Sequence, residues 1–197
     1  MKPIIFSTEM VRAILDGRKT QTRRVIKPQP NGEIKANIPY EFYGSKTERI
    51  FTDTKAYLAP YSVGDVLWVR ETWRCIKYDS MDGNLSYGVK FKDGEQEHFE
   101  FDDNERFHQF GKYAFKNGWQ SPYYMPREAA RLFLLVKAVR VERLQEIAEA
   151  DAIAEGAETV RDNFMHIWNR LNARRGHGWD TNPWVWVIEF ERTEAPS

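Results

Sequence analysis

The sequence predicts a single α+β domain built on a small β-barrel, with short flanking helices. Predicted strands are separated by single short helices, and the first and last strands, at residues 4–6 and 184–190, are both apolar. This combination favours a barrel over a doubly wound sheet. The length of 197 residues suits one compact domain with additions and is too short for two enzyme-sized domains.

The first helix is predicted over residues 8–16. Ser7 or Thr8 can cap its start, apolar residues follow at helical spacing, and Gly17 provides the stop. A basic turn and a strand are predicted next, over residues 18–26. This region is the dense cationic segment of the chain, because residues 12–27 contain six basic residues against one acid, Asp16.

Two stretches are interpreted as insertions, at about residues 28–60 and 79–125. Prolines and glycines interrupt the first stretch, and the second carries seven acids and no Lys or Arg between residues 93 and 105. A central strand is predicted at residues 66–73, and a strand or hairpin at residues 86–91.

The C-terminal third is predicted to hold a long buried strand over residues 130–141 and two helices before the final strand. The first of these helices spans residues 144–155 and ends at Gly156. The second shows one apolar face, ends near Gly176, and is marked by Phe164, Ile167, Trp168 and Leu171.

Charge and composition limit the function classes. The 29 basic residues balance 29 acidic ones, so a nucleic-acid site has to be local rather than a uniform positive field. The single cysteine, Cys75, excludes an internal disulfide and a zinc site built on several thiolates. The four histidines lie far apart at spacings that do not suit zinc, and we expect neither a metal nor a cofactor.

The charged residues Glu9 and Arg12 follow soon after the first apolar residues, so the N-terminal segment lacks the apolar stretch expected of a signal peptide. No apolar run approaches the length of about 18 residues that a membrane span needs. We therefore expect a cytoplasmic protein without a membrane partner.

Four motifs stand out along the chain: Gly-Arg-Lys-Thr-Gln-Thr-Arg at 17–23, Val-Gly-Asp-Val-Leu at 63–67, Asp-Ala-Ile-Ala-Glu-Gly at 151–156 and Val-Ile-Glu-Phe at 187–190. In this order and spacing they resemble the ASCH family, whose domains have a PUA-like β-barrel fold. The likeness covers about residues 4–27, 60–76 and 126–191, and is greatest to the longer phage and prophage members. The resemblance implies a role with RNA or a modified nucleoside, in a cleft lined by the Gly-Arg-Lys-Thr turn.

One bacterial branch of ASCH proteins hydrolyses the amide of N4-acetylcytidine. That branch uses the lysine of the turn, a threonine three positions later and a distant glutamate, and these positions match Lys19, Thr22 and Glu155. The resemblance thus implies that these three residues are catalytic.

The chemistry is plausible from the residue types alone. A threonine hydroxyl needs a base before it can attack, and a lysine can serve when burial or a neighbouring cation lowers its pKa. Glu155 could orient a water, carry a proton, or pair with Lys19 and keep it charged. A surface turn with solvated or salt-bridged basic residues is the alternative interpretation.

The predicted nucleoside-binding residues come from two segments. Arg18, Arg23 and Arg24 belong to the basic turn, and Arg70, Glu71 and Trp73 belong to the aromatic strand. An indole stacks on any nucleobase, and an arginine can stack or bind phosphate. A tryptophan buried in the barrel core is the alternative for Trp68 and Trp73.

Three functions follow as hypotheses. The first is binding of RNA or a modified nucleoside in the cleft between these two segments, by a protein of prophage origin. The second is amide hydrolysis, with Thr22 as nucleophile, Lys19 as base and Glu155 as proton carrier. The third is a non-enzymatic phage or host interaction module whose acidic stretch at 93–105 contacts a protein that the sequence does not identify.

Overall fold

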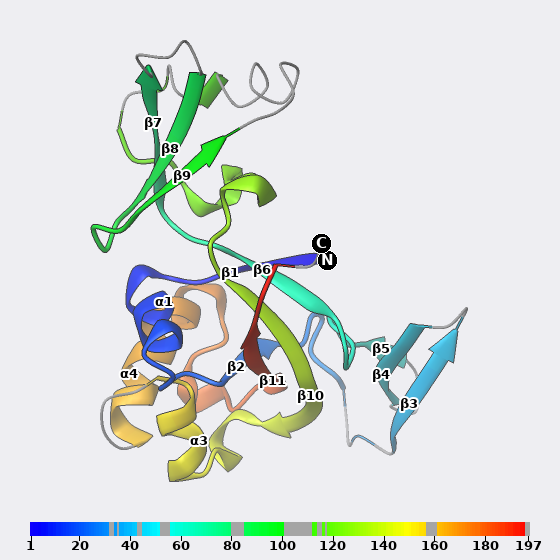
Figure 1. The fold of residues 1–197 in the computed structure, drawn as a ribbon. Helices are drawn as coiled ribbons and strands as arrows, with labels where there is room; N and C mark the ends of the chain where they lie inside the picture. Colours follow the sequence, from blue (N-terminus) through cyan, green and yellow to red (C-terminus); the bar gives the residue numbers. More distant parts are fainter. Residues whose placement is uncertain are drawn as a thin grey trace. The chain divides into compact units, whose positions relative to one another are not determined.

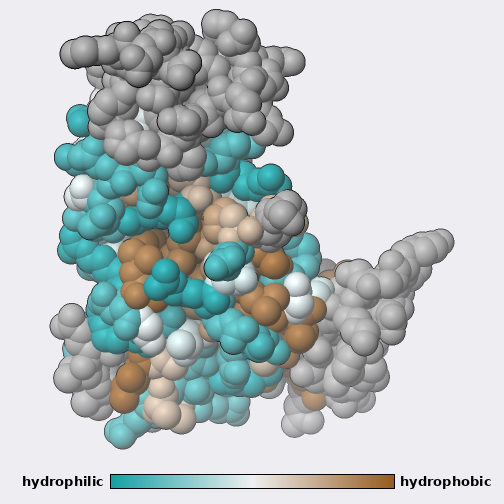
Figure 2. All heavy atoms as spheres, viewed as in Figure 1, coloured by the Kyte–Doolittle hydropathy of each residue, from teal (hydrophilic) through white to brown (hydrophobic). Residues whose placement is uncertain are grey.

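The computed structural model describes residues 1–31, 34, 36–42, 45–51, 56–79, 85–100, 112–113, 116, 118–156 and 161–195. It is a mixed α+β structure with a sheet-dominated core and few helices, which confirms the predicted class (Figure 1). None of the helices in these ranges is long and apolar enough to cross a membrane. On the face drawn in Figure 2, hydrophobic residues lie among hydrophilic ones.

The largest sheet has five strands in the order β1-β6-β10-β11-β2. Their bounds are β1 Lys2–Ile5, β6 Val66–Arg70, β10 Phe133–Arg143, β11 Trp184–Thr193 and β2 Gln21–Val25. The strand order is open among the described residues, so hydrogen bonds do not close this sheet into a barrel. The PUA-like barrel therefore stays a prediction.

Two three-stranded sheets lie largely within the predicted insertions. One contains β3 (Ala36–Phe42), β4 (Ser45–Phe51) and β5 (Ala56–Leu58), and the other contains β7 (Trp73–Asp79), β8 (Leu85–Phe91) and β9 (Gln96–Glu100). The insertion predicted at about residues 28–60 thus contains β3, β4 and β5 despite its prolines and glycines. Residues 101–105 of the acidic stretch lie outside the described residues.

Helix α1 (Thr8–Leu15) ends at the predicted glycine. Gly17 has φ +74° and donates its backbone N–H to the carbonyl of Ile14 at 3.0 Å, a left-handed termination that glycine adopts without strain. The predicted helix 144–155 is instead a 3-10 turn, η3 (Leu144–Glu146), and a short helix, α3 (Glu149–Ala154). Ile147 and Ala148 separate them, because their backbone has ψ angles of 124° and 161°, outside the helical region.

Helix α4 (Arg161–Asn172) continues as a 3-10 turn, η4 (Ala173–Arg175), that ends at Gly176 in the left-handed region, as predicted. Three further 3-10 turns are η1 (Pro122–Tyr124), η2 (Arg127–Ala129) and η5 (Trp179–Thr181).

The chain divides into two compact units, each with its own core. Unit 1 comprises residues 1–2, 13–67 and 134–197, and unit 2 comprises residues 3–12 and 68–133. In unit 1 the apolar faces of α3 and α4 pack on β11, through Ala152, Phe164, Trp168, Val185 and Val187 among others.

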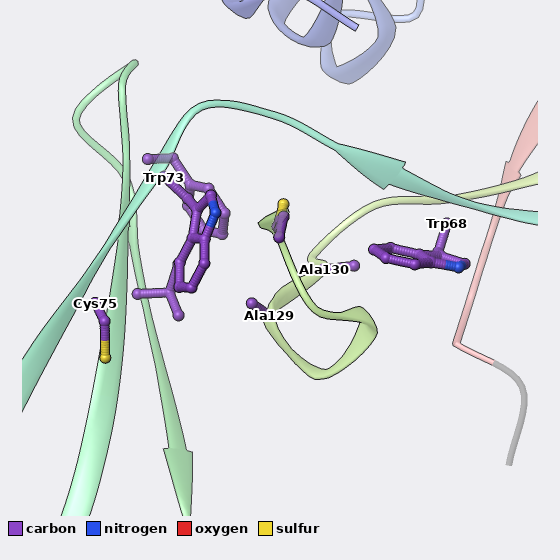
Figure 3. Close-up of a cluster of buried hydrophobic side chains, with 8 residues drawn as sticks. Trp68, Trp73, Cys75, Ala129 and Ala130 are labelled. Atoms are coloured by element: carbon purple, nitrogen blue, oxygen red, sulfur yellow. The ribbon is translucent and has the colours of Figure 1, made fainter. Parts of the chain in front are cut away.

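The core of unit 2 gathers Trp68, Trp73, Cys75, Val89, Phe91, Met125, Ala129 and Ala130. Figure 3 shows the short segment with Ala129 and Ala130 lying between the two indole rings in that view. Trp73 is fully buried there, and its ring meets that of Tyr113 edge-on at 5.1 Å.

Candidate functional site

Lys19 and Glu155 are brought together by backbone pairing within unit 1. After the turn at Gly17, the Lys19 N–H donates to the Ala13 carbonyl at 2.9 Å, and the Thr20 N–H donates to the Ala154 carbonyl at 2.8 Å. Lys19 and Glu155 thereby form an antiparallel β-bridge. Two residues that are 136 positions apart in the sequence become direct neighbours.

The Lys19 side chain is completely buried and acts as an ammonium with three acceptors. Its Nζ donates to Glu155 Oε2 at 2.7 Å, to the Glu155 carbonyl at 2.8 Å and to the Gln21 carbonyl at 2.8 Å. Burial lowers the pKa of Lys19, Glu155 opposes this shift, and the charges of Arg24 and Arg23 add to it. Of the roles considered for Glu155, pairing with Lys19 is the one present in this structure.

Arg23 is also fully buried, and three carboxylates surround its guanidinium. Nε donates to Glu142 at 2.7 Å, Nη1 to Glu155 at 3.2 Å and Nη2 to Asp151 at 3.0 Å. These contacts neutralise the cation internally. They make Arg23 a positioning residue for Glu155.

Gln21, Arg140 and Glu189 extend this network. None of these three residues was predicted from the sequence to belong to the site. Gln21 donates to the Asp151 carbonyl at 2.8 Å, while Arg140 contacts Asp151 at 3.1 Å and forms an ion pair with Glu189. A signal for them existed, because Glu189 interrupts the apolar run at residues 184–190 and pairs with Gln21 in the β2–β11 register.

Asp151 shows the electrostatic effect of this network. Burial raises the pKa of its carboxyl, but Gln21 and the guanidiniums of Arg23 and Arg140 outweigh burial, so that the pKa lies below its ordinary value. The ionised form of Asp151 is therefore favoured in the folded state.

Thr22 and Arg24 lie on the face of β2 opposite to Gln21 and Arg23, because successive residues of a strand alternate in direction. Thr22 is buried opposite Ile188, and its Oγ1 accepts a hydrogen bond from Arg24 Nη1 at 3.1 Å. Arg24 itself is half-buried. Burial lowers the pKa of its guanidinium, and the charges of Glu155 and Tyr61 oppose that shift, which places Arg24 within electrostatic reach of both.

Arg18 points away from this network. Its side chain is exposed and pairs with Asp16 at 2.9 Å. For Arg18, the alternative of a salt-bridged surface residue matches the structure.

The other predicted segment belongs to unit 2, where its residues have partners of their own. Arg131 binds Glu71 through two hydrogen bonds, at 2.9 and 2.8 Å, and also pairs with Asp93. Burial raises the pKa of Glu71, and Arg131 opposes that shift. Trp73 lies in the core, which is the structural alternative considered for it.

Arg70 stacks on an aromatic ring of the same strand. Its guanidinium lies 4.5 Å from the centre of the Trp68 ring, and its buried Nε has no hydrogen-bond partner among the described residues. The structure thus assigns the two halves of the predicted cleft to different compact units, each with its own contacts.

The groups gathered around β2 supply complementary hydrogen-bonding chemistry. An ammonium and a guanidinium donate, a carboxylate accepts, and the hydroxyls of Thr22 and Tyr61 can do both. Across the described ranges, no three His, Cys, Asp or Glu side chains are arranged to hold a metal ion.

Comparison of the chain with models of known families, with curated proteins and with solved structures gives no match.

Proposed function

We propose that the protein binds a modified nucleoside of the N4-acylated cytidine class through Lys19, Thr22, Arg24, Tyr61 and Glu155, which we call the polar site. One observation carries the proposal. Lys19 and Glu155, which the ASCH resemblance pairs across 136 positions, form a 2.7 Å contact. A PUA-like barrel around this site is part of the same proposal.

The half-buried members of the polar site suit the edge and face of such a base. Arg24 can donate to the carbonyl oxygen of a cytosine ring, and Tyr61 offers a ring on which the base can stack. The Glu155 carboxylate, whose charge acts on Arg24, can accept from an amide N–H. Hydrogen bonds to charged groups are strong where water is excluded.

Calorimetric titration with N4-acetylcytidine, cytidine and uridine tests the binding. The variant Arg24→Gln should weaken binding of N4-acetylcytidine at least about tenfold, which corresponds to one lost hydrogen bond to a charged group. Lys137→Gln is the matched control, because Lys137 is an exposed residue of unit 1 that pairs only with Glu191 at 3.0 Å among the described residues. Absence of saturable heat with all three nucleosides would refute the proposal.

Amide hydrolysis is the second candidate, favoured by the lowered pKa of Lys19. In the proposed sequence Lys19 passes a proton to Glu155 across their 2.7 Å contact. Neutral Lys19 then accepts the proton of Thr22 as its Oγ attacks the acyl carbon, and Glu155 protonates the departing cytidine N4. Water hydrolyses the resulting threonyl ester to acetate and regenerates Thr22.

Chromatography of N4-acetylcytidine reaction mixtures tests the hydrolysis. Thr22→Val, Glu155→Gln and Lys19→Met should each abolish cytidine release. Thr20→Val should retain it, because Thr20 is an exposed threonine two positions from Thr22. Equal rates in wild type and Thr22→Val would contradict the assignment, whereas binding without turnover in the wild type would leave only the first proposal.

A further inference from the structure

The sheet β7-β8-β9 of unit 2 has one core face and one face directed away from that core. Trp73 and Cys75 of β7 and Val89 and Phe91 of β8 all point into the core of unit 2. Strand alternation therefore places Arg74 and Lys90, which lie between them, on the opposite face.

This second face is positively charged in an unusual arrangement. Arg74 is directly opposite Lys90, and the next residue in that row is the neutral Gln96. Like charges opposite each other in antiparallel strands destabilise a sheet. None of the ion pairs formed within the described part of the chain involves Arg74, Lys90 or Lys92.

An exposed tryptophan lies beside these cations. The Gln120 N–H donates to the Trp73 carbonyl at 2.7 Å, and this bridge extends the sheet beyond β7. Because Gln120 pairs with Trp73, its neighbour Trp119 lies on the face of Arg74. The Trp119 ring is 5.8 Å from the Arg74 guanidinium and 6.0 Å from Lys92 Nζ, and Trp119 is 42% exposed.

Two exposed tyrosines follow on a well-anchored turn. The η1 turn is capped by Ser121, whose Oγ accepts the Tyr123 N–H at 3.3 Å, and the next residue, Met125, is buried in the core. Tyr123 and Tyr124 are nevertheless 68% and 60% exposed, with ring centres 5.4 Å apart. The backbone thus holds these apolar rings in solvent.

We infer that the sheet face with Arg74, Lys90, Lys92 and Trp119, together with Tyr123 and Tyr124 on the η1 turn that follows Trp119 in the chain, binds single-stranded nucleic acid; these six residues are here named the basic–aromatic face. Unpaired bases stack on exposed aromatic rings, and the intervening phosphates meet the cations beside those rings. A duplex hides its base faces, and an acidic peptide has no need of three exposed rings. The inference does not rest on the proposed nucleoside site, because all its residues belong to unit 2.

Fluorescence anisotropy with labelled oligonucleotides of about ten nucleotides tests this binding. That length is suitable because single-strand-binding domains of the OB-fold type each cover about 4–16 nucleotides. Oligouridine and oligothymidine distinguish RNA from DNA, and binding of either supports the inference. Trp119→Ala and Tyr124→Ala should each weaken binding about tenfold, as loss of one stacked base does, while Trp119→Phe should largely retain it.

The charge contribution is tested by the salt dependence of the affinity. Three cations on phosphates predict a slope of about −2 for log K against log salt, and Lys92→Gln should reduce its magnitude by about 0.7. Arg143→Gln is the matched control, because Arg143 also lies over a tryptophan ring, at 4.3 Å from the centre of Trp184, but in unit 1. It should leave both affinity and slope unchanged.

Several outcomes would overturn the inference. One is absence of binding at about 50 mM salt, where phosphate contacts are strongest. Others are equal affinity for a duplex, equal affinity for inorganic polyphosphate, or unchanged binding in the Trp119→Ala/Tyr124→Ala double variant. Arg24→Gln should leave oligonucleotide binding intact, which separates failure of this inference from failure of the nucleoside proposal.

Discussion

At the scale of single residues, the buried charges of β2 are stabilised by one another. Taking a lysine and an arginine out of water is costly unless each finds well-placed acceptors. Lys19 has three acceptors and Arg23 has three carboxylates, so the network is balanced only while all its members are present. Substituting one member leaves the others uncompensated.

We expect Lys19→Met to lower the free energy of unfolding by about 3 kcal/mol, the low end for breaking a buried ion pair, because Arg23 still contacts Glu155. Lys137→Met, at an exposed pair, should cost less than about 1 kcal/mol. The double variant Lys19→Met/Glu155→Gln should cost less than the sum of its single variants. Urea denaturation measures all four, and strict additivity would contradict the coupling.

Asp151 gives a pH-dependent prediction. Its pKa is lowered in the folded state, so its stabilising contribution is present above the ordinary value of 3.8 and is lost as the pH falls through the lower folded value. Asp151→Asn should therefore cost about 1 kcal/mol at neutral pH and progressively less below about pH 4. Denaturation at pH 7, 5 and 3 measures the difference. Asp16→Asn, at an exposed site, is the control, and a constant difference at all pH values would contradict the prediction.

The sequence allowed the pairing of Lys19 with Glu155 to be predicted through motif resemblance, but not its surroundings. Whether Arg23 faces a ligand or three carboxylates depends on which elements cover β2. Residue types and strand alternation do not contain that information. Trp73 illustrates the same limit, because a stacking tryptophan and a core tryptophan have the same sequence signal.

At the scale of elements, two glycines fix the backbone that brings Lys19 to Glu155. Gly17 and Gly156 both have positive φ, at +74° and +86°, a region that other residues enter only with strain. Their surroundings differ. A Cβ on Gly17 would meet nothing within 4 Å, whereas one on Gly156 would lie 3.0 Å from the Cβ of Ala13 and 3.2 Å from the Cβ of Lys19.

Gly17→Ala should therefore cost about 1 kcal/mol, the cost of the left-handed backbone alone. Gly156→Ala should cost at least about 1 kcal/mol more, because the crowded side chains have to move. It should also impair the polar site, since Lys19 is one of the displaced neighbours. Thermal unfolding of the two variants measures the difference, and equal melting temperatures would contradict the close contact at Gly156.

Elements with strong periodicity were predictable. Helices α1 and α4 and strands β10 and β11 lie where apolar spacing placed them, within a few residues. The predicted C-terminal end of the strand at residues 66–73 is wrong, because β6 ends at Arg70 and Trp73 begins β7. Both segments are rich in β-forming residues, so local preference does not show where one strand stops and the next begins.

At the scale of the whole molecule, each of the two compact units has a hydrophobic cluster of its own among the described residues. Each core lies wholly within its unit, although both units are assembled from separated segments of the chain. The sequence could not reveal this division, because the boundaries fall inside β1, α1, β6 and β10 rather than in a linker of recognisable composition.

Two tryptophan variants test the division into units. Trp73→Ala and Trp168→Ala should each cost about 3–5 kcal/mol, as large-to-small changes in a core do. In hydrogen exchange, Trp73→Ala should first reduce amide protection in unit 2, and Trp168→Ala should first reduce it in unit 1. Identical loss of protection throughout the chain in both variants would contradict two separate cores.

The pairing of β2 with β11 has a consequence for biosynthesis. Gln21 leaves the ribosome well before its partner Glu189, because most of the described chain separates the two residues. Until Glu155 and then β11 have been translated, the cations of β2 lack these partners and remain hydrated on the nascent chain. The charge network of unit 1 therefore assembles late, and its formation requires closure of a long loop, which slows folding.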